Sequence, residues 1–403
     1  MRCTNGNRGL TGPTRPSKAD SPLAPGSRLL FVDNLRTLLI VMVIMVHLSI
    51  TYGGLGSWCY KEVEQPDLLT ASLLSTQNAV FQSFFMGLLF LVSGYFVPGS
   101  YDRKGPRRFL WDRLLRLGIP LLIYDYLLNP LLVGVLMTAG VLGAHRSFRQ
   151  WALNYYTGFH VGTGPLWFVE ALLLFVLLYA ALRLVWKRPP RAIEHDGYVP
   201  GHASLVALAL GLGLFSFLVR IRLPVGWELD HLNLQLPFFP QYVALFILGV
   251  VAYRRNWLLR LPRQLARPWL ALAVILIAVV LPLLATLGGV MKGDISKLTG
   301  GWHWQALAYA LWEQLLGVSL MAGLLILFRE RFNAQGRLAR AAAASSYTVY
   351  IVHAPVIVLF ALAVQSVHLY PLLKYAVVAS VIIPLSFVLA HLLRKLPAAQ
   401  RIL

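Results

Sequence analysis

Arg36 and His47 interrupt an apolar stretch, residues 29–51, that is long enough to cross a bilayer. A helix turns about 100° and rises about 1.5 Å per residue, so eleven steps return His47 to within about 20° of Arg36 and about 16 Å further along the axis. Hydrocarbon penalises ionisable groups, and two of them on one stripe indicate an interior lined by protein or water. The spacing predicts a charged group near the membrane edge and a titratable group deeper in.

His47 has the chemistry of a general base, because an imidazole with an ordinary pKa of about 6.5 can accept a proton from a hydroxyl. A simple hydrogen-bond donor in a binding site is the other interpretation. Arg36 follows Asp33 by three residues. An ion pair on one helix face and phosphate binding near the membrane edge are therefore equally compatible with Arg36.

Arg113 and Arg116 form a second pair of cations, at the start of another apolar run. Their i, i+3 spacing projects both from one side of a helix. Positive charge on the cytoplasmic side of a membrane explains the upstream Arg107 and Arg108. Guanidinium groups match phosphate oxygens, so Arg113 and Arg116 predict a site for a phosphorylated cytoplasmic ligand.

Further polar side chains at membrane depth admit two roles each. Ser93 and Gly94 end the second apolar span, where small residues favour close helix packing. Ser346, Tyr350 and His353 share one helix face at i, i+4 and i+7. These three either line a cavity or hold two helices together.

Asp125, Glu170 and Glu313 are acidic groups at or near membrane depth, and each is expected to pair with an arginine or a histidine. Glu170 and Glu313 are also candidates to line the site, together with Ser93, Tyr350 and His353. The sequence does not identify the partners. It contains no nucleotide-binding glycine loop, metal-ligand spacing or Gly-x-Ser-x-Gly elbow. Its two cysteines, Cys3 and Cys59, cannot build a disulfide framework or a metal cluster. No metal is therefore expected.

Membrane helices must position these residues. The 403 residues are 58% hydrophobic and 13% charged, whereas soluble domains carry about 25% charged residues. The net charge of +20 does not indicate a nucleic-acid partner, because the basic residues lie between apolar spans instead of forming one patch. The composition predicts an all-α, polytopic helix bundle in a lipid bilayer.

Apolar stretches of about 20 residues predict about ten spans. Basic residues concentrate in the N-terminal tail and in alternate connections, which by the positive-inside rule places both termini in the cytoplasm. The expected organisation is a disordered basic tail at 1–28, one transmembrane domain at 29–395 and a short cytoplasmic tail at 396–403. The predicted spans are 29–51, 77–97, 114–139, 164–186, 202–221, 238–254, 268–288, 304–328, 342–365 and 371–393.

Five stretches between residue 31 and about residue 357 carry a family pattern through their order and spacing: FVDNLRTLLIVMVIMVH, FFMGLLFLVSGYFVP, RFLWDRLLRLGIP, GPLWFVEALLLF and SSYTVYIVHAPV. On these motifs the chain resembles the acyltransferase 3 membrane proteins, and within them the glucan-succinylating branch. The resemblance implies an enzyme that transfers acyl groups other than aminoacyl groups. The donor would be a cytoplasmic acyl-CoA, acetyl-CoA or succinyl-CoA, and the acceptor a hydroxyl of an extracytoplasmic glycan or related molecule.

The resemblance also implies roles for individual residues and a location. It maps the catalytic site onto His47, as the base, and Arg36, and donor contacts onto Arg36, Arg113 and Arg116. Ser93, Gly94, Tyr350 and His353 match patterned positions without a defined role. The expected location is the bacterial inner membrane, with several passes. Direct transfer and an acyl-enzyme are both compatible with the motifs, and the oligomeric state is open.

The alternative function is a secondary transporter or exporter of a small polar or glycan-type substrate. Histidines, arginines and carboxylates inside helices also mark substrate and proton pathways. Such transporters usually contain paired repeats with interrupted helices. The sequence shows no such repeat, which favours the acyltransferase.

Overall fold

The computed structural model describes residues 28–141, 147–158, 162–186, 197–229, 232–290, 295–397 and 399–402. Within these ranges the chain is helical, and its β pairing is limited to an isolated antiparallel bridge between Leu229 and Leu234. The described part of the chain contains ten helical segments that are long and apolar enough to cross a membrane. This confirms the predicted all-α polytopic bundle. The predicted tail at 1–28 lies outside the described residues except for Arg28.

The α-helices are α1 (Leu30–Thr51), α2 (Leu68–Gln82), α3 (Phe85–Lys104), α4 (Pro106–Arg113), α5 (Ile119–Ile123), α6 (Asn129–Thr138), α7 (Phe148–Thr157), α8 (Trp167–Trp186), α9 (His202–Arg220), α10 (Phe239–Arg254), α11 (Trp257–Arg260), α12 (Ala266–Ile275), α13 (Leu281–Leu287), α14 (Ser296–Thr299), α15 (Trp304–Arg331), α16 (Arg337–Ala363) and α17 (Pro371–Leu393). The π-helical turns are η1 (Leu114–Gly118), η2 (Tyr124–Leu128) and η6 (Leu276–Val280). The 3₁₀ turns are η3 (Gly164–Leu166), η4 (Leu236–Phe238), η5 (Arg263–Leu265) and η8 (Ala399–Arg401).

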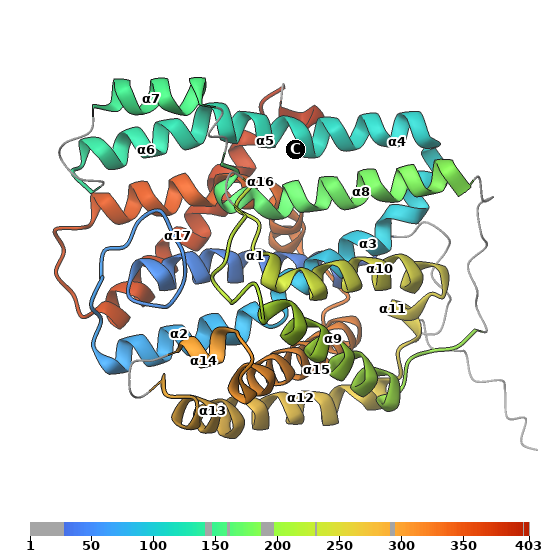
Figure 1. Cartoon of the computed structure of the whole chain (residues 1–403). Coiled ribbons are helices and arrows are strands. Elements are labelled where there is room, and N and C mark those ends of the chain that lie inside the picture. Colours follow the sequence, from blue (N-terminus) through green and yellow to red (C-terminus); the bar gives the residue numbers. More distant parts are fainter. Residues whose placement is uncertain are drawn as a thin grey trace, which may run out of the picture.

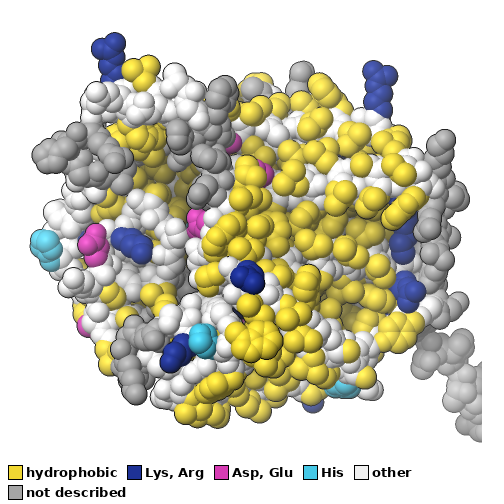
Figure 2. Space-filling model, in the orientation of Figure 1, with side chains coloured by type: hydrophobic (Ala, Val, Ile, Leu, Met, Phe, Trp, Pro, Cys, Tyr) yellow, Lys and Arg dark blue, Asp and Glu magenta, His cyan; other side chains and the backbone are white. Residues whose placement is uncertain are grey.

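Helix α1 lies in the middle of the bundle and packs against α2, α3, α15, α16 and α17 (Figure 1). The α4–α6 segment forms one edge of the view in Figure 1, and α12 and α13 form the opposite edge. Hydrophobic side chains gather into a broad area on the right of the face in Figure 2, as expected for a surface in contact with lipid. Because five other helices pack against α1, this first membrane segment is enclosed by protein.

The bundle has two ends, which we call the basic end and the loop end. The basic end is where α1 begins and where α3 meets α4, beside Arg103 and Lys104. The loop end is where α1 finishes and residues 52–67 connect it to α2. Helix α1 therefore runs from the basic end to the loop end, and its side chains lie at different depths between them.

Glycines set the contact between α3 and α10, which pack closely side by side. A Cβ on Gly94 would lie 3.1 Å from the Phe246 carbonyl carbon, and a Cβ on Gly249 would lie 2.8 Å from the Tyr95 nitrogen. The two backbones approach this closely because neither position has a side chain. The predicted packing role of Gly94 is confirmed.

The second span begins earlier than predicted, at Leu68 instead of residue 77, and runs to Lys104. Asp67 caps its start by accepting hydrogen bonds from the Leu69 and Thr70 backbone N–H groups. The span is broken into α2 and α3 at Ser83 and Phe84. Hydropathy missed the first part because capping, and not apolar content, decides where this helix starts.

The third span also begins earlier, at Pro106 instead of residue 114. Its first turns carry charged side chains and lie outside the apolar run that defined the prediction. Two π-helical turns, η1 and η2, interrupt the regular helix further along. Such turns are frequent at functional sites, and these two contain Arg116 and Asp125.

Candidate functional site

Two predicted site residues, His47 of α1 and His353 of α16, meet inside the bundle. Their ring centroids are 4.9 Å apart. The His353 side chain is fully buried, and the His47 side chain is half-buried. The sequence named each histidine as a candidate without predicting that they would be neighbours.

Hydrogen bonds to the backbone fix the tautomer of each ring when it is neutral. The Nδ1 of His47 lies 2.9 Å from the Val43 carbonyl oxygen, and the Nδ1 of His353 lies 2.6 Å from the Tyr350 carbonyl oxygen. A carbonyl oxygen only accepts, so each Nδ1 carries the hydrogen and donates it. Each Nε2 is then the basic nitrogen, and that of His353 is buried with no hydrogen-bond partner among the described residues.

Trp58 covers the histidine pair from the loop end. Its ring centroid is 4.1 Å from that of His47. The indole N–H is buried and has no partner in the described part of the chain. Sequence reasoning missed Trp58, because a tryptophan in a connecting loop looks the same as an ordinary interfacial anchor.

A buried ion pair fastens the loop that carries Trp58. Lys374 of α17 donates to Glu62 at 2.5 Å, and the Lys374 side chain is only 4% exposed. The Lys374 ammonium also lies 5.9 Å from the centroid of the Tyr52 ring. Burial, followed by the nearby Glu62 carboxylate, raises the pKa of Tyr52, so its phenol stays protonated at neutral pH.

A second fastening ties the end of the same loop to the start of α17. The Tyr370 hydroxyl donates to Asp67 at 2.9 Å. Hydrogen bonds from the Thr70 hydroxyl and backbone N–H lower the pKa of Asp67, so this carboxylate is an anion at neutral pH. The loop is thus held at both Glu62 and Asp67.

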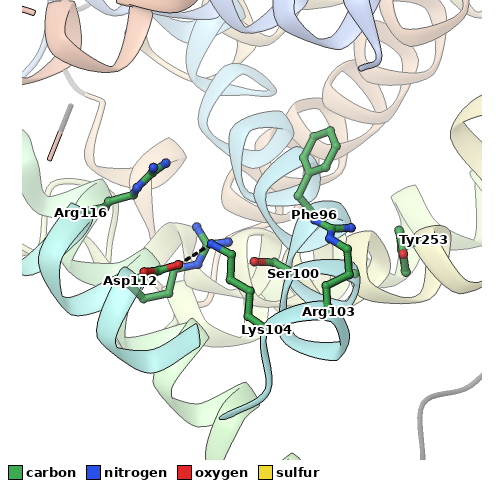
Figure 3. Close-up of a pocket in the computed structure, with 9 residues that line it drawn as sticks. Phe96, Ser100, Arg103, Lys104, Asp112, Arg116 and Tyr253 are labelled. Carbon is green, nitrogen blue, oxygen red and sulfur yellow. Dashed lines mark hydrogen bonds and ion pairs between the residues drawn. The ribbon is translucent and has the colours of Figure 1, made fainter. Parts of the chain in front are cut away.

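The arginine cavity lies at the basic end of the bundle and has a volume of about 220 Å³. Arg113 and Arg116 both line it, which agrees with the predicted common side, and Arg103 and Lys104 add two cations (Figure 3). Asp112 pairs with Lys104 in its wall. The other lining residues are Phe96, Gly99, Ser100 and Tyr253. A concave site with this excess of positive charge suits an anion.

Arg36 lies beside the arginine cavity. Its guanidinium is 3.5 Å from the Asp33 carboxylate, so the predicted local ion pair exists. The guanidinium carbon also lies 5.7 Å from the centroid of Phe96, which lines the cavity. Arg36 is therefore a cation of α1 that lies next to this site, while His47 lies further along the same helix.

Glu313 pairs with an arginine, as expected. It forms an ion pair with Arg220 at 2.6 Å, and both side chains are 1% exposed. Gln314 donates a further hydrogen bond to the same Glu313 oxygen at 3.0 Å. Glu313 lines neither described cavity, and the pair accounts for it as a link between α9 and α15. Ser93 is half-buried on α3 and also lines neither cavity.

Asp125 and Glu170 depart from the expected pairing, because neither has an arginine or histidine partner within the described ranges. Both line a second cavity of about 360 Å³ between the α5–η2 segment and α8, which we call the acidic cavity. The expectation was wrong for these two because η2, which follows α5, and α8 bring their carboxylates to one cavity whose described lining has no basic residue.

The chain is similar to known proteins over much of its length. A family model described as "Acyltransferase domain" matches residues 29–391. Proteins named "Glucans biosynthesis protein C" from Escherichia coli O6:K15:H31 (strain 536 / UPEC) and Shigella dysenteriae serotype 1 (strain Sd197) are 27% identical to the chain over 238 residues. The similarity covers 57% of this chain and 59% of the length of each relative. No solved structure matches.

Proposed function

Because this chain belongs to the acyltransferase 3 family, we propose that it moves an acetyl or succinyl group from a cytoplasmic acyl-CoA to a hydroxyl of an extracytoplasmic glycan or related acceptor. One observation carries this proposal. A single enclosed helix, α1, has Arg36 beside the arginine cavity and His47 at the covered histidine pair. A donor held by its phosphates at one end of α1 would have its thioester directed toward the other.

The arginine cavity supports the donor half of the proposal. Arg103, Lys104, Arg113 and Arg116 give the CoA phosphates several cationic partners. The rise from Arg36 to His47 is about 16 Å along the helix. The extended pantetheine arm of CoA would cross this length and bring the thioester to His47.

The histidine pair supports the chemical half. The Nε2 of a neutral His47 takes the proton of the acceptor hydroxyl while the hydroxyl oxygen attacks the thioester carbonyl carbon. The carbon–sulfur bond then breaks, and the leaving CoA thiolate takes the proton from the His47 imidazolium, which restores the neutral base. Binding both reactants against one base supplies the orientation that such a step requires.

The names of the relatives bear on the acceptor. Both relatives are described as glucan biosynthesis proteins, and a glucan offers the hydroxyls that the reaction needs. With the basic end in the cytoplasm, as the positive-inside rule indicates, both termini lie inside and Trp58 faces the extracytoplasmic side. Because both relatives come from bacteria, we also propose that the protein lies in a bacterial inner membrane.

The test is acyl transfer by the purified protein, with radiolabelled acetyl-CoA or succinyl-CoA and a gluco-oligosaccharide. Loss of a general base lowers the rate about 10²- to 10⁴-fold, so His47→Ala should do so while acyl-CoA still binds. His391→Ala is the matched control, because His391 is exposed at the end of α17. Transfer by His47→Ala at the wild-type rate would remove His47 from the mechanism.

A further inference from the structure

The acidic cavity is not used by the proposed reaction. Gly118, Leu121, Leu122 and Asp125 line one wall at the i, i+3, i+4 and i+7 positions of the third span. Glu170, Leu173 and Leu174 line the opposite wall on α8, and Thr163 completes it. Helix α8 packs against α4 and η1, and this close packing is lost along α5, which leaves the cavity open. Figure 1 shows α5 and α8 next to each other at this edge of the bundle.

The cavity is polar at one end and apolar at the other. Asp125, Thr163 and Glu170 lie toward the loop end, because η2 follows α5 and Glu170 is in the first turn of α8. The leucines and Gly118 extend from there toward the basic end. Leu122 is 58% exposed and Leu174 is 48% exposed, so the apolar part opens onto the surface that faces lipid.

Asp125 lacks, among the described residues, the hydrogen-bond donor that a buried charge requires, whereas the half-buried Glu170 has a hydroxyl donor. Asp125 is 5% exposed, and its Oδ1 is buried with no hydrogen-bond partner in the described residues. Glu170 accepts a hydrogen bond from the Thr163 hydroxyl at 3.0 Å. A buried carboxylate without a donor is unfavourable, and the π-helical turn η2 nevertheless places Asp125 at this cavity. A ligand that donates hydrogen bonds and carries positive charge would satisfy both acids.

We propose that the acidic cavity binds a membrane lipid with a primary ammonium headgroup, its ammonium between Asp125 and Glu170 and one acyl chain along the leucines. The apolar, lipid-facing opening selects an amphiphile over a free amine. The described residues of the lining include no basic side chain, so an anionic headgroup finds no counter-charge among them. This site lies apart from the arginine cavity and does not depend on the proposed acyl transfer.

The test is native mass spectrometry of the purified protein with phosphatidylethanolamine, phosphatidylcholine and phosphatidylglycerol of identical acyl chains. Phosphatidylethanolamine should be retained at least about tenfold better than either of the others, because charge-assisted hydrogen bonds require its N–H groups. Asp125→Asn with Glu170→Gln should abolish that preference. Glu228→Gln is the control, since Glu228 is a loop-end carboxylate that already accepts from Gln235.

A steric variant keeps the test decisive if the acidic substitutions disturb folding. Leu122→Trp retains both carboxylates and fills the opening, so it should also lose phosphatidylethanolamine. Equal retention of phosphatidylethanolamine and phosphatidylcholine by the wild type would overturn the proposal. So would an unchanged preference in the monodisperse double variant.

Discussion

In the proposed reaction, His353 acts as a positioning residue for His47. Its ring lies against His47, and its own Nδ1 is bound to the backbone. Removing it leaves space beside the base, and small misplacements of a reacting group can lower a rate about 10²-fold. We expect His353→Ala to reduce kcat by about this factor with an unchanged KM for acyl-CoA. His353→Gln, which keeps most of the volume, should retain more activity; equal loss in both would indicate a chemical role instead.

The arginine cavity gives a prediction about the donor alone. Hydrogen bonds to charged groups contribute about 1.5–3 kcal/mol each, so Arg113→Ala and Arg116→Ala should each raise the KM for acyl-CoA at least about tenfold. The rate at saturating acyl-CoA should change little. Arg340→Ala is the control, because it removes an exposed arginine at the start of α16. A KM for acyl-CoA that both cavity variants leave unchanged would move the donor site elsewhere.

The buried Arg220–Glu313 ion pair leads to a prediction about the stability of the folded protein. Removing one partner of a buried ion pair strands the other charge and costs about 3–5 kcal/mol. We expect Glu313→Leu to lower the melting temperature in detergent sharply, and Arg220→Met with Glu313→Leu to recover most of the loss. A double variant that is as unstable as the single variant would show that the pair itself, and not the stranded arginine, matters.

At the scale of elements, the loop of residues 52–67 is the part of the chain that, in the proposed reaction, separates the thioester of the bound acyl-CoA from the medium. Trp58 covers His47, and Glu62 and Asp67 fasten the loop to α17 and to Tyr370. Excluding water protects a reactive intermediate from hydrolysis. The loop must also admit the acceptor, so it combines closure with access.

Opening this loop should therefore allow water, instead of the acceptor hydroxyl, to attack the thioester. We expect Trp58→Ala to increase acyl-CoA hydrolysis several-fold in the absence of an acceptor, measured as free CoA thiol, while Trp58→Phe stays near the wild type. Trp302→Ala is the control, because Trp302 is exposed near the start of α15. Hydrolysis by Trp58→Ala that does not exceed the wild-type level would show that Trp58 only packs.

At the scale of the whole molecule, hydropathy and charge were sufficient for the ten spans, and helical spacing was sufficient to put Arg113 and Arg116 on one side. Both are local properties. The meeting of His47 with His353 depends on how α1 and α16 pack, which no periodicity within either helix specifies. The position of Trp58 depends on the path of a loop. The position of Asp125 and Glu170 at one cavity depends on how η2 and α8 lie relative to each other.

The central position of α1 has a consequence for biosynthesis. Among the ten spans of the described residues, α1 comes first along the chain, whereas three of the helices that pack against it, α15, α16 and α17, come last. During synthesis His47 therefore has no His353 ring beside it until α16 has left the ribosome. A growing polypeptide that stalls before α16 would hold the His47 imidazole in the bilayer without the second ring, and so without the histidine pair on which the proposed reaction depends.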